Sequence, residues 1–492
     1  MEGEAGRDQA RPASLWPTLL VAFLPFLGWW TYGLFDLDEG FYGSVVAEMN
    51  RRHEWITPYY NGHPWFEKPI LLYWVGKPLM AAFGDAVGAR LPSVLAAIAT
   101  MALIGWFAKR RFSPAAGQMT ILVLGGSLFW VLASRMMIAD PLLVLCETGA
   151  MIAFWESLQG SKGARAWCGL AVGFGTLAKG PVAIFLFAVL AAWTYWREPD
   201  CRKGFRGGWL GFWAALLVSV SCWYLPAYLQ NGYTFIDNFF IKQNLERFTG
   251  GDTAHNAGLV GLLIYPATLF VGMFPWSLKL VKAWPRRSQD SGEDVRLKRY
   301  VASWAGIVFI FFTISSAKLP SYVLPCLPPL ALLLGVYTTE GLGPREIRPL
   351  RSLVGPVILV VVVGVLAQVG FSIWYDKSGQ RELHSMAAYV ANQSPATVAA
   401  YQMPRRDHDL GTLKPKIQET SHPSLPMVVN RPVLEVEKFD DLLHAPLPVM
   451  ILTRTDRIQP YDFAAAKRAG LNLEELPRPD EANYKLFLLT SH

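Results

Sequence analysis

The chain has 492 residues, of which 52% are hydrophobic and only 17% are charged, against the roughly 25% charged residues of an average soluble protein. This composition, with 19 tryptophans, excludes a soluble enzyme, a secreted disulfide scaffold and a disordered chain. The net charge of +7 comes from basic residues in short clusters between apolar runs, a pattern typical of cytoplasmic loops rather than of a nucleic-acid-binding surface.

Charge is unevenly distributed along the chain. Residues 1–375 contain 54 Asp, Glu, Lys and Arg, whereas the 117 residues of 376–492 contain 29, nearly twice the density. The sequence therefore predicts a transmembrane domain over 1–375 and a soluble domain over 376–492.

About eleven apolar stretches within residues 1–375 approach the roughly 20 residues that a membrane-spanning helix needs. We expect an all-α polytopic membrane domain. The predicted spans begin near Leu15, Ala89, Ala115, Ile138, Ala166, Val182, Trp209, Gly258, Val301, Tyr322 and Leu353.

Basic residues predict the orientation of these spans. Clusters such as Lys109-Arg110-Arg111 and the cations between 197 and 206 all fall on the same side as the N-terminus. The positive-inside rule then places the N-terminus in the cytoplasm. After an odd number of spans the tail lies outside, which is the periplasm for a bacterial inner-membrane protein.

The two longest outer connections are predicted over residues 35–80 and 229–257. In the first, Val45, Val46 and Met49 share one face at helical spacing, which indicates a helix lying in the membrane interface. The tail alternates short apolar runs with helical patterns, so we expect a small extracytoplasmic α/β domain. Its strands are predicted at Val398–Tyr401, Met427–Val429, Val449–Leu452 and Tyr484–Leu489, and a helix at Tyr461–Ala469.

A second set of charged residues lies at or near the outer ends of the spans. Charges close to the hydrocarbon are costly unless they are paired or hydrated, so a set of both signs on one face of the membrane is a candidate site. The alternative is that each residue only marks the end of a span. The set comprises Asp38, Glu39, Glu67, Lys68, Asp140, Lys179, Glu246, Arg247 and Lys318.

Gly173-Phe174-Gly175, followed by Lys179-Gly180, has some likeness to a phosphate-binding loop. It does not open a helix after a strand, and small residues inside a span usually serve helix packing. We therefore predict a packing role for these glycines.

Three segments together carry a family resemblance. The first contains Asp38-Glu39-x-x-Tyr42 and Glu67-Lys68-Pro69, the second Ala139-Asp140-Pro141 and Ala178-Lys179-Gly180-Pro181, and the third Ser315 to Pro325 with Lys318 and Tyr322. Over most of the first 330 residues the sequence resembles the bacterial lipid A aminoarabinose transferases, which share the GT-C clan with the protein O-mannosyltransferases.

The resemblance implies a bundle of spans with interfacial helices, an outer active site and a polyprenyl-phosphate sugar donor. It implies that Asp38 is the essential carboxylate and that Lys68 holds the donor phosphate, with Arg247 and Tyr322 as further phosphate ligands. Lys318 is a further candidate phosphate ligand. Glu39, Tyr42, Asp140 and Lys179 are further site candidates.

The resemblance also implies a possible divalent metal, zinc or magnesium, with Glu67 among its ligands. The sequence departs from the family pattern here, because Asn244 stands where the family has its metal-binding histidine. Phe41 likewise replaces the arginine of the family's first motif. Both changes put the metal and the aminoarabinose specificity in question.

The residues themselves are consistent with glycosyl transfer from a lipid phosphate. Lys68, Arg247 and Tyr322 can stabilise a leaving phosphate, and Asp38 can accept the proton of an acceptor hydroxyl or orient an acceptor phosphate. The acceptor is predicted to be lipid A or another part of lipopolysaccharide, with protein Ser/Thr as the alternative. A transporter of a lipid-linked sugar is a further alternative, although no internal repeat is present.

Overall fold

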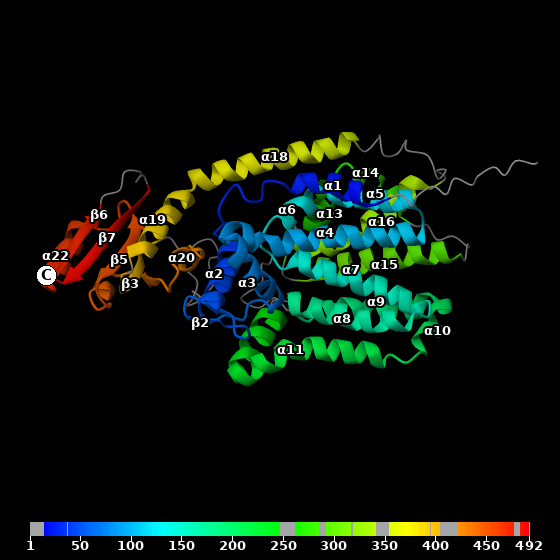
Figure 1. Ribbon diagram of the computed structural model, residues 1–492, viewed down its shortest axis with the longest axis horizontal. Coiled ribbons are helices and arrows are strands. Elements are labelled where there is room, and N and C mark those ends of the chain that lie inside the picture. The colour runs from blue at the N-terminus through cyan, green and yellow to red at the C-terminus, as the bar shows by residue number, and fades with distance from the viewer. Residues whose placement is uncertain are drawn as a thin grey trace, which may run out of the picture.

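The computed structural model is predominantly helical, with one five-stranded sheet near the C-terminus (Figure 1). It describes residues 14–36, 38–246, 261–284, 292–315, 318–340, 354–393, 395–403, 422–476 and 483–491. Long helices pack side by side in a bundle, and α18 (Val354–Lys377) runs from the bundle to the sheet.

The bundle contains helices of very different length. Its elements are α1 (Trp16–Phe23), η1 (Leu24–Phe26), α4 (Asp85–Arg111), α5 (Pro114–Gly125), α6 (Leu128–Ser134), α7 (Asp140–Leu158), α8 (Lys162–Lys179), α9 (Val182–Arg197), η2 (Pro199–Cys201), α10 (Arg202–Phe205), α11 (Leu210–Phe235), the π-helix η3 (Ile236–Glu246), α13 (Gly261–Gly272), α14 (Ser277–Ala283), α15 (Glu293–Ile314), η5 (Pro320–Cys326) and α16 (Leu327–Thr339).

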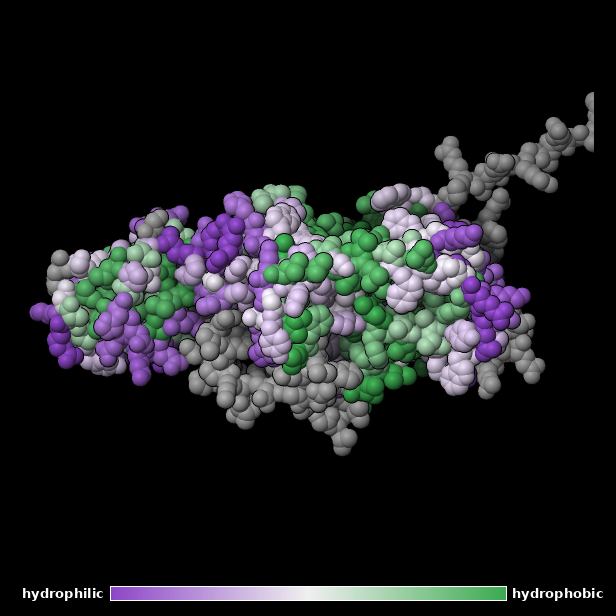
Figure 2. Space-filling view, turned by 90° about the horizontal axis from the view of Figure 1, so that it is seen from below, coloured by the Kyte–Doolittle hydropathy of each residue, from purple (hydrophilic) through white to green (hydrophobic). Residues whose placement is uncertain are grey.

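A helix begins within four residues of ten of the eleven predicted starts, and α15 begins eight residues before the predicted start at Val301. Among the described residues, five helices are long and apolar enough to cross a membrane, and two sharply bent pairs raise that number to seven. The bundle presents a largely apolar surface, whereas polar residues gather at its two ends (Figure 2).

Close helix contacts depend on small residues, as predicted for Gly173. A Cβ on Gly173 would lie 2.5 Å from the Cβ of Ser219 in α11, and one on Gly169 would lie 2.1 Å from the carbonyl oxygen of Phe212. Only glycine at these positions lets α8 and α11 pack this closely, which is a common device in membrane bundles.

Between the bundle and the sheet lie α2 (Asp38–Arg51), the short hairpin β1 (Tyr59–Tyr60) and β2 (His63–Pro64), and α3 (Leu71–Phe83). Val45, Val46 and Met49 are fully buried on one face of α2, so the predicted shared face is confirmed. Burial of this face fixes α2 against the bundle and leaves Asp38 exposed at its first turn.

The C-terminal sheet has the strand order β4-β3-β5-β7-β6. Strand β3 pairs in parallel with β4 and β5, and β7 pairs antiparallel with β5 and β6. The elements after α18 are α19 (Gln380–Gln393), β3 (Thr397–Tyr401), α20 (Leu425–Val428), β4 (Leu434–Val436), α21 (Phe439–Leu442), β5 (Val449–Arg454), α22 (Pro460–Arg468), β6 (Leu471–Leu476) and β7 (Tyr484–Ser491).

Both faces of this sheet are covered. Residues of α19 and α20, including Leu383 and Leu425, pack on one face, and residues of α21 and α22, including Phe439 and Ala466, pack on the other. Three predicted strands and the predicted helix are present in the tail. The predicted strand at Met427–Val429 is wrong, because Pro426 at the start of α20 favours a helical turn there.

Candidate functional site

The loop between α2 and α3 brings several of the predicted site residues together. Lys68 Nζ lies 3.0 Å from a carboxylate oxygen of Glu67, and both side chains are mostly buried. The same ammonium lies 5.9 Å from the centre of the Tyr42 ring. A cation held between a carboxylate and an aromatic face is fixed in position yet keeps donors available for an anion.

Asp38 lies near this group, at the start of α2. The pKa of the Tyr73 hydroxyl is raised well above its ordinary value, by burial first and then by the negative charges of Glu67 and Asp38. The rings of Tyr42 and Tyr73 lie 6.3 Å apart. Asp38, Tyr42, Glu67, Lys68 and Tyr73 therefore form one local group, which we call the Lys68 cluster.

A second group, the Lys179 cluster, forms where α7 begins and α8 ends. Lys179 Nζ lies 2.6 Å from Asp140 Oδ1 and 4.3 Å from the centre of the Tyr322 ring. Pro141 and Gly180 set these positions, because the first opens α7 and the second, at a φ of 84°, ends α8. Helix α3, which follows Lys68, packs against α8.

Lys318 lies at the C-terminal end of α15. Its ammonium donates to the carbonyl oxygens of Phe312 and Thr313, the former at 3.0 Å, and lies 5.3 Å from the centre of the Tyr265 ring. These bonds satisfy carbonyls that have no partner within the helix, so Lys318 has a capping role that the sequence did not predict.

Glu39 has an environment unlike that of its neighbour Asp38. Its carboxylate is fully buried and forms two 2.7 Å hydrogen bonds with Arg90, one to each oxygen. It also accepts from the backbone N–H of Met137 at 2.8 Å. A carboxylate bonded on both oxygens and closed to solvent fixes the fold of the loop.

Sequence reasoning missed Arg90 and also Asp36, a buried carboxylate two residues before Asp38. Asp36 accepts from His422 at 3.1 Å and from the backbone N–H of Ser424 at 2.9 Å. The acidic pattern Asp36-x-Asp38-Glu39 was the available signal, but the partners of Asp36 lie more than 380 residues away.

Part of the predicted site falls outside the residues that the structure describes. Arg247 lies outside the described residues, and the side chains of Asn244 and Glu246 are not described. Within the part of the chain that the structure describes, no three His, Cys, Asp or Glu side chains are arranged to hold a metal ion. Among the described residues, Glu67 has the Lys68 ammonium beside it, and this pair does not fit the implied metal.

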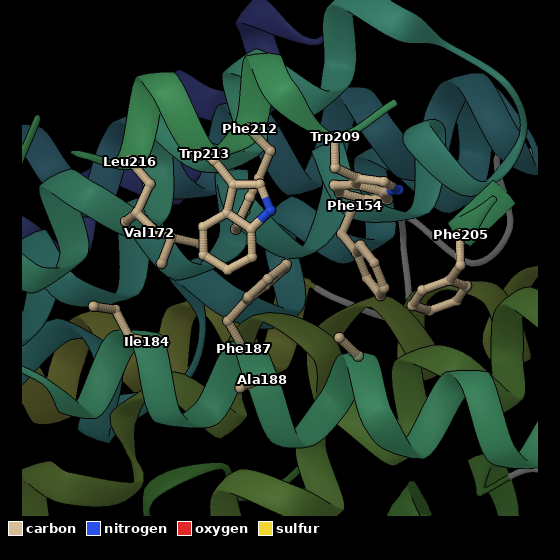
Figure 3. A pocket seen from close by; sticks show the side chains of 11 residues that line it. Phe154, Val172, Ile184, Phe187, Ala188, Phe205, Trp209, Phe212, Trp213 and Leu216 are labelled. Carbon is tan, nitrogen blue, oxygen red and sulfur yellow. The ribbon is translucent and has the colours of Figure 1, made fainter. Parts of the chain in front are cut away.

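A cavity of about 350 Å³ lies between α9 and α11, over α7 and α8 (Figure 3). Phe187, Trp213 and Leu216 are among its lining residues, and the lining is apolar or aromatic throughout. It contains none of the predicted site residues, so the cavity offers no groups for the chemistry expected of the two lysine clusters.

Two solved structures are similar to this fold. A crystal structure of ArnT from Cupriavidus metallidurans bound to undecaprenyl phosphate is similar over 96% of this chain and 97% of that one, with a TM-score of 0.73 and 19% identity. The arabinofuranosyltransferase AftD from Mycobacteria is similar over 98% of this chain and 40% of its own length, with a TM-score of 0.51 and 13% identity. The fold is that of the GT-C membrane glycosyltransferases.

Sequence relatives narrow the class. Residues 67–224 match the family described as dolichyl-phosphate-mannose-protein mannosyltransferase. The undecaprenyl phosphate-alpha-4-amino-4-deoxy-L-arabinose arabinosyl transferase of Edwardsiella ictaluri is 31% identical over 68% of this chain and 61% of its own length. A Pseudomonas fluorescens protein of the same name is 31% identical over 76% of this chain and 68% of its own.

The chain belongs to the undecaprenyl phosphate-aminoarabinose arabinosyl transferase family, as the sequence resemblance predicted. It is a multi-pass protein of the inner membrane. The alignments span about 60% of the length of several of these relatives.

Proposed function

We propose that this protein transfers a sugar from a polyprenyl-phosphate donor to lipid A or another part of lipopolysaccharide. The observation that carries the proposal is the pair of lysines, Lys68 and Lys179, each held between a carboxylate and a tyrosine ring. The relatives are named as transferases of a sugar carried on undecaprenyl phosphate, and these names support a donor of this kind.

In this proposal the acceptor oxygen attacks the anomeric carbon of the sugar. The bond from that carbon to the phosphate oxygen breaks, and polyprenyl phosphate leaves with the bonding electrons. Lys68 stabilises the charge on the leaving phosphate, with Tyr322, Lys318 and Arg247 as further ligands. Asp38 takes the proton of an acceptor hydroxyl, or orients an acceptor phosphate that has no proton to lose.

The remaining residues hold this arrangement. Glu67 positions Lys68, Asp140 positions Lys179, and Tyr42 covers the Lys68 ammonium. Glu39 fixes the loop through Arg90.

We further propose eleven spans within residues 1–375, with the N-terminus in the cytoplasm and the C-terminal α/β domain, 376–492, in the periplasm. The basic ends of α4 and α9 support this orientation. Lys68 and Lys179 then lie on the periplasmic side, where lipid-linked sugars rather than nucleotide sugars are available.

Transfer to protein Ser or Thr is the second candidate, favoured by the description of the family that matches residues 67–224. The deciding experiment gives purified protein in nanodiscs a radiolabelled polyprenyl-phosphate sugar together with lipid A and a Ser/Thr-rich peptide. Label in the lipid fraction supports the first function and label in the peptide supports the second. Activity with a nucleotide sugar alone contradicts the donor assignment.

A further inference from the structure

The carboxylate of Asp36 lies at the end of a partly buried chain of hydrogen bonds. Tyr375 contacts His384 Nδ1 at 2.6 Å, His384 Nε2 contacts Ser424 Oγ at 2.6 Å, and Ser424 Oγ contacts Asp36. His422 adds a separate bond to Asp36 at 3.1 Å. The chain links the loop before α2 to α18, α19 and the segment before α20.

The direction of these bonds follows from the charge of Asp36. An ionised carboxylate only accepts, so Ser424 and His422 must donate to it. Ser424 Oγ is then free to accept from His384 Nε2–H, and His384 Nδ1 accepts from Tyr375. Every proton in the chain points towards Asp36.

Ser424 is fully buried. Its hydroxyl, although bonded to His384, therefore cannot act as a nucleophile on an external substrate. Burial disfavours the charge of Asp36, but the hydrogen bond from His422 and the nearby histidines outweigh it, and the pKa of Asp36 falls below its ordinary value. The chain is therefore a fixed polar anchor inside the protein.

The same tail segment packs directly on the first turns of α2. Ser44 donates to the carbonyl oxygen of Pro423 at 2.6 Å. A Cβ on Gly40 would lie 3.0 Å from the backbone nitrogen of Ser424 and 3.1 Å from Asp36 Oδ1. Residues 422–424 therefore hold the start of α2, and Asp38 occupies the first position of that helix.

A second attachment lies further along the loop. The side chain of Asn61 accepts from the backbone N–H of Val433 at 2.7 Å and donates to its carbonyl oxygen at 2.9 Å. The tail is thus bonded to the 35–80 region both at the start of α2 and in the hairpin that follows α2.

We infer that Asp36, His422 and Ser424 are positioning residues for Asp38, and that the C-terminal domain thereby forms part of the scaffold of the active site. The inference rests on the proposed function, in which Asp38 meets the acceptor. The donor phosphate is held by Lys68 and residues of other elements, so loss of the anchor should lower kcat and leave KM for the donor nearly unchanged. A misplacement of about 1 Å costs roughly 100-fold in rate.

The test compares His422→Ala with His422→Asn. The asparagine amide occupies the place of the imidazole Nδ1 and still donates to Asp36, whereas alanine leaves that carboxylate one donor short. We expect kcat to fall roughly 10- to 100-fold in His422→Ala and to recover substantially in His422→Asn. Glu382→Gln is the matched control, because Glu382 bonds Asn483 and Tyr484 within the tail.

Amide hydrogen exchange of residues 38–44 supplies a readout that is independent of activity. We expect faster exchange there in His422→Ala and Ser424→Ala, and no change in Glu382→Gln. Wild-type exchange in both alanine variants, or wild-type kcat in His422→Ala, overturns the inference. An inactive wild-type protein overturns the proposed function instead, while faster exchange in the variants would still support the anchor.

Discussion

Asp38 and Glu39 are adjacent in sequence and have opposite environments. Asp38 is exposed at the first turn of α2, whereas Glu39 is buried against Arg90. Charge alone therefore does not identify a reacting group in this loop. What distinguishes Asp38 is access to solvent together with its place in the Lys68 cluster, beside Tyr73.

We predict that Asp38→Asn lowers turnover by roughly 100- to 10,000-fold, because the amide keeps the shape of the side chain and loses its charge and basicity. Donor binding and the melting temperature should stay near wild type. The measurement is kcat with a polyprenyl-phosphate sugar. Asp85→Asn is the control, since Asp85 is also an exposed aspartate in the first turn of a helix. Near-normal turnover in Asp38→Asn would exclude a catalytic role.

We predict that Lys68→Ala weakens binding of the donor and slows transfer, because the phosphate loses its cation. Lys68→Arg should restore activity only in part, since the guanidinium is planar and longer than the ammonium. Binding of a polyprenyl-phosphate sugar in nanodiscs measures the effect. Lys162 is an exposed lysine at the start of α8, whereas Lys179 lies at the end of that helix, and Lys162→Ala should bind the donor as the wild type does. Equal affinity in Lys68→Ala would remove Lys68 from the site.

Four residues of the Lys68 cluster were predicted from the sequence, where they lie close together, and Tyr73 was not. Glu67 and Lys68 are neighbours, and Asp38 and Tyr42 lie in the preceding helix, α2. Arg90 and His422 could not be found this way, since each partners an acidic residue that is far away in the chain. A single sequence shows which residues are acidic. It does not show which distant basic residue pairs with each of them, and therefore not which of them are buried.

Packing of α8 on α11 depends on single glycines. We predict that Gly169→Ala destabilises the protein by about 1–3 kcal/mol, because the new Cβ would lie 2.1 Å from the Phe212 carbonyl oxygen. Gly163→Ala in the same helix is the control, as no atom lies within 4 Å of its Cβ. Thermal unfolding in detergent measures both variants. Equal melting temperatures would show that α8 and α11 are not packed this closely.

The junction between the tail and α2 should respond to pH. Burial lowers the pKa of His384, and the nearby charge of His422 lowers it further, whereas Asp36 raises it. The folded protein thus binds its proton less readily than the unfolded chain. Neutral His384 therefore contributes to the free energy of unfolding above about pH 6.5, and this contribution is lost as the pH falls below that value.

We expect the melting temperature of the protein to decline between about pH 6.5 and pH 5, and His384→Gln to make that decline shallower. Tyr375, Ser424, Asp36 and His422 are the polar groups facing His384. An identical slope in His384→Gln would show that His384 titrates normally.

Helices and strands could be predicted where the sequence has a long apolar run or short apolar runs that alternate with polar segments. Strands β3, β5 and β7 have largely apolar sequences and were found, whereas β6 (Leu471–Leu476) carries two glutamates on an edge strand and was missed. Helix α15 begins eight residues before its predicted start. Its first turns are polar and are stabilised by ion pairs, such as Arg299 with Glu198 at 3.3 Å, that no hydropathy pattern indicates.

At the scale of the whole molecule, the sequence located the starts of the helices better than it located the contacts between domains. The eleven starts follow from apolar runs, each of which is local. The contact of residues 422–424 with α2 joins segments separated by most of the chain, and the sequence offered no sign of it. The tail is thus attached to the loop that carries Asp38, which places both on the same side of the membrane.

Orientation in the membrane is the last prediction. Basic residues at the ends of α4 and α9 predict a cytoplasmic N-terminus, and eleven spans then place the sheet in the periplasm. In a Cys222→Ser background, which removes the exposed native thiol, Gln393→Cys in α19 should react with an impermeant maleimide in intact spheroplasts.

Arg206→Cys, an exposed position beyond α10, should react only after lysis. The reverse pattern would invert the protein in the membrane and move Lys68 and Lys179 to the cytoplasmic side. Labelling of both positions in intact cells would require an even number of spans between them. The reverse pattern would contradict a periplasmic reaction site, because Asp38 and the tail are joined through Asp36 and must share one side, whereas labelling of both positions would contradict the eleven-span topology alone.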